Sequence, residues 1–191
     1  SYLWDDTMGY KESIYEMLVW EYLELVKGYF VKMDERYKRC GEGDIDVIAV
    51  RIEDRKIVDV IVGEVVSITP DEDDIDEFIK DIHSKLEELR EKLCWLSALI
   101  EKPRIVLYCW FADEKTKTKI REYANSKGIE VEFFDDIIVE LVNFLVDYKK
   151  KCGKDNWFHD RKYMLTWFLQ LVLSSLKDKF KSEEKEIQEL F

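Results

Sequence analysis

The stretch from residue 43 to residue 68, GDIDVIAVRIEDRKIVDVIVGEVVSI, constrains the fold most, because it consists of two extended runs joined by a short turn. Both runs are rich in Val and Ile, and the charged segment Glu53–Lys56 separates them, which predicts a β-hairpin. Asp46 interrupts the first apolar run, and Glu64 interrupts the second. A buried carboxylate without a partner is costly, so each must be solvated, paired or bound to a cation.

The spacing of these acids predicts which way they face. Side chains two positions apart share one face of a strand, roughly 6.6 Å apart. Asp46 should therefore face the same side as Ile48. Glu64 should face the same side as Val62 and Val66. If the strands pair so that these two faces coincide, both carboxylates meet at one end of the hairpin, where they could hold a divalent metal.

A helix that carries acidic residues, YEMLVWEYLELVKGYFV, precedes G-D-I-D-V-I-A, and the second strand ends in E-V-V-S. This order resembles the PD-(D/E)XK nuclease superfamily, in particular its archaeal Holliday-junction-resolvase-like and Mrr-like branches. The resemblance implies a restriction-endonuclease-like α/β fold, with a mixed central β-sheet flanked by helices. It also implies that Asp46 and Glu64 bind Mg²⁺ or Mn²⁺ together with a backbone carbonyl near Val65. Glu16 would bind or orient a second metal or its water.

The sequence departs from this family at one position, where Val66 stands in place of the motif lysine. The resemblance implies that this lysine positions the attacking water and offsets developing negative charge. The loss of one such contact can cost roughly 10² to 10³ in rate. Lys80 or Lys85, on the helix that should follow, could take its place.

Two functions therefore stay open. The first is a metal-dependent phosphodiesterase that acts on DNA, with weak or altered activity. The second is a catalytically inactive nuclease-fold module for protein assembly or nucleic-acid-associated binding. The formal charge of -12 argues against a surface built throughout to hold nucleic acid. A local basic stretch is either a solvated loop or an edge that contacts phosphates, and it comprises Lys32, Arg36, Lys38 and Arg39.

Periodic apolar residues predict the remaining elements. A stripe from Tyr10 to about Tyr29 predicts a helix that Lys27 and Gly28 end, with Glu16 beside that stripe. A regular repeat from Ile75 to Ile100 predicts a long helix that either packs across the sheet or forms a dimer seam. Residues 104–112 and 129–134 predict two strands, and the helix 114–126 between them favours a parallel crossover.

The chain is expected to form a nuclease-like domain over residues 1–151 and a helical C-terminal extension over residues 152–191. The segment from Trp157 to Phe180 is apolar nearly all round but too short to span a bilayer. It should therefore be buried against the domain or a second copy, which predicts a homodimer and no membrane partner. The four cysteines lack zinc-site spacing, and no signal peptide is recognised, so a cytoplasmic protein with free thiols is expected.

Overall fold

The computed structural model describes residues 9–36, 44–66, 74–92, 103–110, 112–153, 158, 160 and 162–180. Lys38 and Arg39 lie outside this part of the chain, as does the end of the predicted long helix, residues 93–100. Contacts within the chain divide it into two compact units, Ser1–Ile137 and Ile138–Phe191. The division falls inside helix α5 (Phe134–Cys152), whereas the sequence places a boundary after residue 151.

The first unit contains a five-stranded mixed sheet with the order β1-β2-β3-β4-β5. Its strands are β1 (Phe30–Arg36), β2 (Asp44–Glu53), β3 (Lys56–Val66), β4 (Arg104–Cys109) and β5 (Ile129–Phe133). The first three strands pair antiparallel, and β3, β4 and β5 pair parallel. The predictions of an α/β fold with a mixed sheet and of a parallel pair after the hairpin are confirmed. The restriction-endonuclease-like assignment stays a prediction.

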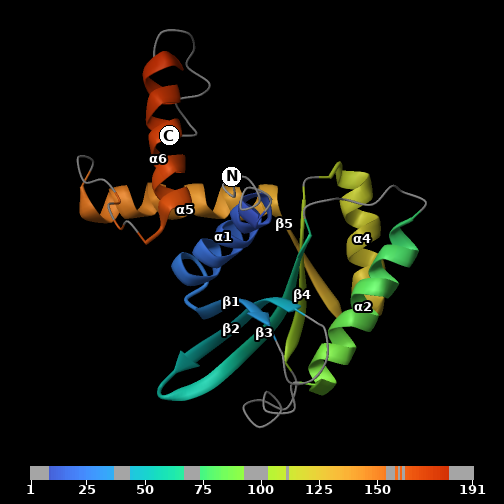
Figure 1. The fold of residues 1–191 in the computed structure, drawn as a ribbon. Coiled ribbons are helices and arrows are strands. Elements are labelled where there is room, and N and C mark those ends of the chain that lie inside the picture. The colour runs from blue at the N-terminus through green and yellow to red at the C-terminus, as the bar shows by residue number, and fades with distance from the viewer. Residues whose placement is uncertain are drawn as a thin grey trace, which may run out of the picture. The chain divides into compact units, whose positions relative to one another are not determined.

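Helices flank this sheet on both faces. Figure 1 shows α2 (Ile75–Lys92) and α4 (Glu114–Ser126) on one side of the sheet and α1 (Gly9–Leu25) on the other. The main apolar core lies between the sheet and the α2–α4 pair, because one face of each element is apolar. Its buried members are Ile45, Ile48, Val60, Val62, Ile75, Ile79, Ile82, Ile105, Leu107, Cys109, Ile120, Ala124, Ile129 and Phe133.

The predicted hairpin is the longest strand pair of the sheet. Asp54 and Arg55 form its turn with φ values of 48° and 64°, which match the twist of the flanking strands in a two-residue hairpin. Beyond a bulge next to Arg51, the ladder places Ile48 opposite Val62. A slip of one residue would turn either strand's core side chains to the other face, so burial of both residues fixes this register.

The second unit contains the rest of α5 and α6 (Met164–Phe180). The ring of Phe158 lies 5.6, 5.4 and 5.9 Å from the rings of Phe144, Tyr148 and Tyr163, measured between centroids. The backbone N–H of Phe158 donates to the Gln170 Oε1 atom at 3.0 Å. These contacts form a small aromatic core that packs the two helices together.

Helix α6 begins at Met164, seven residues later than the apolar pattern suggests. Before it, Asp160 accepts hydrogen bonds from the N–H groups of Lys162 and Tyr163, which forms a turn that the helix follows. Among residues 164–174, the part of α6 whose side chains are described, the exposed large apolar residues are Met164, Trp167, Phe168 and Val172. Their burial by a second copy stays a prediction. None of the described helices combines the length and apolar character that crossing a membrane requires.

Gly63 lies in the middle of the sheet, next to Glu64, and we predict that Gly63→Ala destabilises the fold. A Cβ atom at this position would lie 2.9 Å from Tyr108 Cε2 and 3.3 Å from both Val106 O and Val47 Cβ. Tyr108 is fully buried and has no room to move, so the free energy of unfolding should fall by about 3 kcal/mol in urea denaturation.

Gly128→Ala is the matched control for this substitution. Gly128 has φ +73° but no heavy atom within 4 Å of an added Cβ, so the variant suffers only backbone strain of about 1 kcal/mol. Equal losses in the two variants would show that the contact of Gly63 with Tyr108 is not tight.

Candidate functional site

Asp46 lies near the start of β2 and Glu64 near the end of β3, and the structure brings their carboxyl groups together. The last pair of the ladder is Val47 opposite Gly63, so the two acids occupy the next position on each strand. Their carboxyl groups lie within hydrogen-bonding reach of each other. The backbone N–H of Val65 donates to Asp46 Oδ2 at 2.8 Å, which fixes one oxygen of that carboxylate.

The acid pair lies toward the carboxyl end of the parallel strands. The ladder between β3 and β4 continues where the ladder between β2 and β3 stops, and it places Glu64 opposite Leu107. Open α/β sheets bind ligands at the carboxyl ends of their strands, because the strands there give way to loops. Glu64 faces α2, since Val62 and Val66 on the same face contribute to the core beneath that helix.

Lys85 on α2 reaches this pair from the helix side. Its Nζ atom forms a hydrogen-bonded ion pair with Glu64 Oε1, and 41% of the lysine side chain is exposed against 13% of the glutamate side chain. The sequence offers Lys80 and Lys85 as candidates to replace the motif lysine. Lys85 is the one that lies at the site, while Lys80 is exposed elsewhere on the helix.

The surroundings of Glu64 disfavour the negative charge of its carboxylate. Burial raises its pKa, the charge of Asp46 raises it further, and Lys85 opposes both, with the result that the pKa rises from 4.5 to about 7. The second oxygen of Glu64, Oε2, is buried and has no hydrogen-bond partner among the described residues. Two carboxyl groups in contact, one of them with an unsatisfied oxygen, need either a shared proton or a cation.

This donor set suits a hard divalent cation. Asp46 and Glu64 supply carboxylate oxygens, and the hydrogen bond from the Val65 N–H brings the backbone of Val65 beside them. Mg²⁺ commonly uses one or two carboxylates and keeps several waters, so two acids and a carbonyl suffice. No group of three or more His, Cys, Asp or Glu side chains suited to a metal occurs in the described part of the chain.

Glu16 comes from the opposite side of the sheet. It is half-buried on α1, and α1 lies on the other side of the sheet from α2 (Figure 1), the helix whose Lys85 binds Glu64. The ring of the preceding Tyr15 lies 4.8 Å from Trp110 and stacks at 5.3 Å on Phe134. These contacts place this turn of α1 at the carboxyl ends of β4 and β5. A role for Glu16 in orienting a metal or its water stays a prediction.

The predicted basic stretch is described only in part. Lys32 is exposed on β1 opposite Ile48, which places it on the sheet face that carries Asp46. Arg36 is the last residue of β1. Lys38 and Arg39 fall outside the described residues. Contact of these side chains with phosphates stays a prediction.

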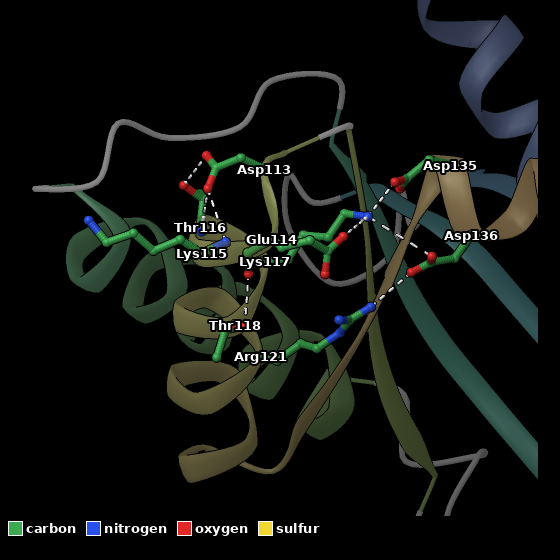
Figure 2. Close-up of polar contacts among 9 residues, drawn as sticks. All are labelled: Asp113, Glu114, Lys115, Thr116, Lys117, Thr118, Arg121, Asp135 and Asp136. Atoms are coloured by element: carbon green, nitrogen blue, oxygen red, sulfur yellow. Dashed lines mark hydrogen bonds and ion pairs between the residues drawn. The ribbon is translucent and has the colours of Figure 1, made fainter.

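A second polar cluster joins α4 to the start of α5, and Figure 2 shows it. Lys117 is only 3% exposed and forms ion pairs with Asp135 and, at 3.2 Å, with Glu114. Arg121 pairs with Asp136 at 2.8 Å. The partners raise the pKa of Lys117 against the opposing effect of burial, so the cluster favours the charged ammonium. This arrangement fastens two helices together, because Lys117 and Arg121 of α4 each pair with a carboxylate of α5.

A third cluster lies on the α1 face of the sheet. Arg104 donates to Asp59 at 2.8 Å and pairs with Glu130, which links β3, β4 and β5. The hydroxyl of Tyr29 also donates to Asp59, at 2.5 Å. Burial works against ionisation of Asp59, but the hydrogen bonds from Tyr29 and Arg104 outweigh it and lower the pKa. Asp59 is thus fully engaged in tying the sheet to the start of β1.

Sequence reasoning did not identify the second and third clusters. The second unites residues of α4 with the first turn of α5, and the third includes a hydrogen bond between two residues 75 positions apart. The available signal was local only, with Lys117 and Arg121 one helical turn apart and Asp135 and Asp136 adjacent. Such charges usually indicate a solvated surface, so the pattern alone did not indicate burial of Lys117.

We predict that ionisation of Glu64 makes stability fall as pH rises toward neutrality. Below pH about 4.5 the carboxyl is protonated in both states, and above it the unfolded chain loses this proton first. The free energy of unfolding should therefore fall between pH 4.5 and about 7, by roughly 3 kcal/mol, and then level off.

Denaturation of the protein and of Glu64→Gln across this pH range measures the effect, because the variant lacks the titrating group. The difference between the two curves should show the fall, and carbon NMR should show a Glu64 midpoint near pH 7 that Asp46→Asn lowers. A difference that does not change with pH would mean that Glu64 is as well solvated as in the unfolded chain.

The Lys117 cluster makes a separate prediction about stability. Lys117→Met keeps much of the buried volume but removes the charge that faces Asp135, so the free energy of unfolding should fall by about 2 kcal/mol. Lys115→Met, at an exposed position two residues earlier, should change it by less than about 0.5 kcal/mol. A loss in Lys117→Met as small as that in Lys115→Met would contradict the structural role of the buried ammonium.

Comparison of the chain with protein-family models, curated proteins and solved structures gave no significant match. The function of the site formed by Asp46, Glu64 and Lys85 therefore has to be inferred from the chemistry of these residues.

Proposed function

We propose that this protein is a metal-dependent phosphodiesterase that acts on DNA in the manner of an endonuclease, with Asp46 and Glu64 as ligands of Mg²⁺ or Mn²⁺. One observation carries the proposal, namely the contact of the two carboxyl groups while the buried Glu64 Oε2 has no hydrogen-bond partner among the described residues. A cation bound by oxygens of both acids would satisfy this atom. It would also offset burial and the charge of Asp46, which together raise the pKa of Glu64.

Each residue of the site has its own role in binding the ion. Asp46 keeps one oxygen on the Val65 N–H, which orients its carboxylate beside Glu64. Glu64 presents Oε2 from within the protein, where water competes little for it. The carbonyl of Val65 and bound waters complete the ligand set of this ion. Glu16 lies on α1, on the other side of the sheet, so in this proposal it orients a second ion or its water near the carboxyl ends of β4 and β5. When bound, the metal lowers the pKa of a water and stabilises charge on the phosphate during hydrolysis.

The alternative is a catalytically inactive module with the same scaffold, which acts in protein assembly or nucleic-acid-associated binding. The specific observation in its favour is Val66, which is half-buried against the core at the position where the resemblance expects a lysine. The net charge of -12 also disfavours tight binding of DNA over a wide surface. Self-association through the exposed apolar side chains of α6 would suit such a module.

A cleavage assay separates the two functions. We expect the protein to cut at least one of a DNA junction, a flap or a single strand in the presence of Mn²⁺. Asp46→Asn and Glu64→Gln should each lower the rate by roughly 10² or more, because each removes a charged ligand while keeping the side-chain shape.

Glu122→Gln is the matched control, since it removes a carboxylate from the exposed surface of α4 and should cleave at the parental rate. Calorimetric titration with Mn²⁺ accompanies the assay. Saturable metal binding without cleavage of any substrate would support the inactive module, and equal cleavage by Asp46→Asn and the parent would reject the proposed site.

A further inference from the structure

Helix α6 buries polar side chains and exposes apolar ones, the reverse of what a helix on a protein surface normally does. Among residues 164–174, the two buried side chains are Thr166 and Gln170. Gln170 accepts the hydrogen bond from the N–H of Phe158, whose ring packs on α5. Met164 and Phe168, by contrast, are 60% and 59% exposed. Water therefore contacts the apolar side of this helix, whereas its polar side faces the protein.

The exposed apolar side chains form one continuous surface, the α6 apolar face, which consists of Met164, Trp167, Phe168 and Val172. Because successive helical residues are about 100° apart, these four lie within an arc of about 140° and extend about 12 Å along the helix axis. Thr166 and Gln170 lie on the opposite side of the helix. A contiguous exposed apolar surface commonly marks a contact with a protein or a membrane.

Lysines lie beside the start of this face. The last turn of α5 carries residues 149–151, all lysine, and Lys162 precedes α6. The ring of Phe158 contacts the rings of Tyr148 and Tyr163, at 5.4 and 5.9 Å between centroids, which joins the end of α5 to the start of α6. The Lys162 Nζ atom lies 5.1 Å from the centroid of the Tyr163 ring. The lysines of both segments are therefore held near the first turn of α6.

The charge of the chain is divided unevenly between its two units. Residues 1–137 carry 20 Lys or Arg and 33 Asp or Glu, whereas residues 138–191 carry ten and nine. Within the second unit, residues 149–162 contain six Lys or Arg and two Asp. Lys150 also pairs with Asp147 at 3.4 Å, but both side chains are exposed, and such pairs are weak. The end of α5 and the start of α6 thus form a local basic region in an acidic protein.

This basic region decides which partner fits the α6 apolar face. A second copy that covered the face by two-fold symmetry would set the same surface against itself, so the lysines of the two copies would repel each other. Single-stranded nucleic acid would attract the lysines and stack on Trp167 and Phe168, but it offers no apolar phase to Met164 and Val172. A bilayer with anionic headgroups suits both features, because its acyl chains take up apolar side chains and its headgroups attract lysines.

We propose that the α6 apolar face and the adjacent lysines dock this protein on the surface of an anionic bilayer, with α6 in the plane of the interface. The segment is too short to span a bilayer, but a helix that lies in the interface needs no spanning length. Trp167 and Phe168 enter the boundary between headgroups and acyl chains, while Lys150, Lys151 and Lys162 contact the headgroup phosphates. Docking needs neither metal nor cleavage, so this proposal is independent of the phosphodiesterase function.

Sedimentation of the whole protein with lipid vesicles tests the proposal. We expect binding to vesicles made of equal parts of phosphatidylglycerol and phosphatidylcholine, and binding weaker by about fivefold or more to vesicles of phosphatidylcholine alone. Trp167→Gln should weaken binding to the anionic vesicles by about tenfold or more, because it removes a large apolar ring from the bilayer. Joint substitution of Lys150→Gln and Lys151→Gln should weaken it by roughly tenfold or more, and added salt should weaken binding of the parent.

Two matched controls use exposed residues of the first unit. Tyr123→Gln removes an exposed aromatic ring from α4, and joint substitution of Lys80→Gln and Lys115→Gln removes two exposed lysines from α2 and α4. Both controls should bind anionic vesicles as the parent does. Circular dichroism of every variant should match that of the parent, because all the substituted side chains are exposed.

Several outcomes would overturn the proposal. The first is absence of binding to anionic vesicles, and the second is equal binding by Trp167→Gln and the parent. A dimer in sedimentation velocity that Trp167→Gln dissociates, without vesicle binding, would assign the face to a second copy. Oligonucleotide binding that the same variant loses, again without vesicle binding, would assign it to nucleic acid.

The docking proposal and the phosphodiesterase proposal fail separately. Asp46→Asn should bind anionic vesicles as the parent does, because the acid pair takes no part in docking. A parent protein that binds these vesicles through Trp167 but cleaves no DNA would reject the phosphodiesterase alone. A parent that cleaves DNA and binds no vesicles would reject docking alone.

Discussion

The pairing of β2 with β3 is the constraint on which the candidate site depends. Asp46 and Glu64 meet because the ladder runs to Val47 and Gly63 and because both acids face the α2 side. A slip of one residue would send one carboxylate to the other face of the sheet and would also expose a row of buried Val and Ile side chains. The apolar core therefore sets the position of the acids, and the same packing that stabilises the fold brings two like charges together.

That position carries an energetic cost, which the neighbouring elements reduce only in part. Burial and the charge of Asp46 both disfavour ionisation of Glu64, and Lys85 compensates for some of this but leaves the pKa near 7. Replacement of both acids by apolar side chains would relieve the cost, because their neighbours on that face already form part of the core. Two acids and an ion-paired lysine at one end of the hairpin therefore cost stability, and perturbed pKa values of this kind cluster at functional sites.

Alternation of side chains along a strand is visible in the sequence. The sequence could therefore predict the hairpin and the sheet face on which Asp46 and Glu64 lie. It could also predict that the two acids meet at one end of the hairpin. The choice between Lys80 and Lys85 could not be made, because it depends on the rotation of α2 about its axis against the sheet. The end of the first helix near Lys27 and Gly28 could also be predicted from the glycine, and α1 ends close to it, at Leu25. Gly28 takes a left-handed φ of +73°, and Tyr29 turns back to bind Asp59. The second cluster, around Lys117, and the third cluster, around Arg104, were missed for a related reason. Each depends on contacts between elements, and no local sequence pattern encodes such contacts.

The direction of the pKa shifts distinguishes the candidate site from the other charged clusters. Around Asp59 the donors outweigh burial and lower the pKa, and around Lys117 the carboxylates outweigh burial and raise the pKa, so both clusters stabilise the charges that they contain. Glu64 is the opposite case, because its pKa is raised and the surroundings oppose its charge. A cluster that stabilises its own charges gains little from an added ion. The pair of Asp46 and Glu64 gains the most, since a cation would remove the repulsion between the acids and satisfy the buried oxygen in a single step.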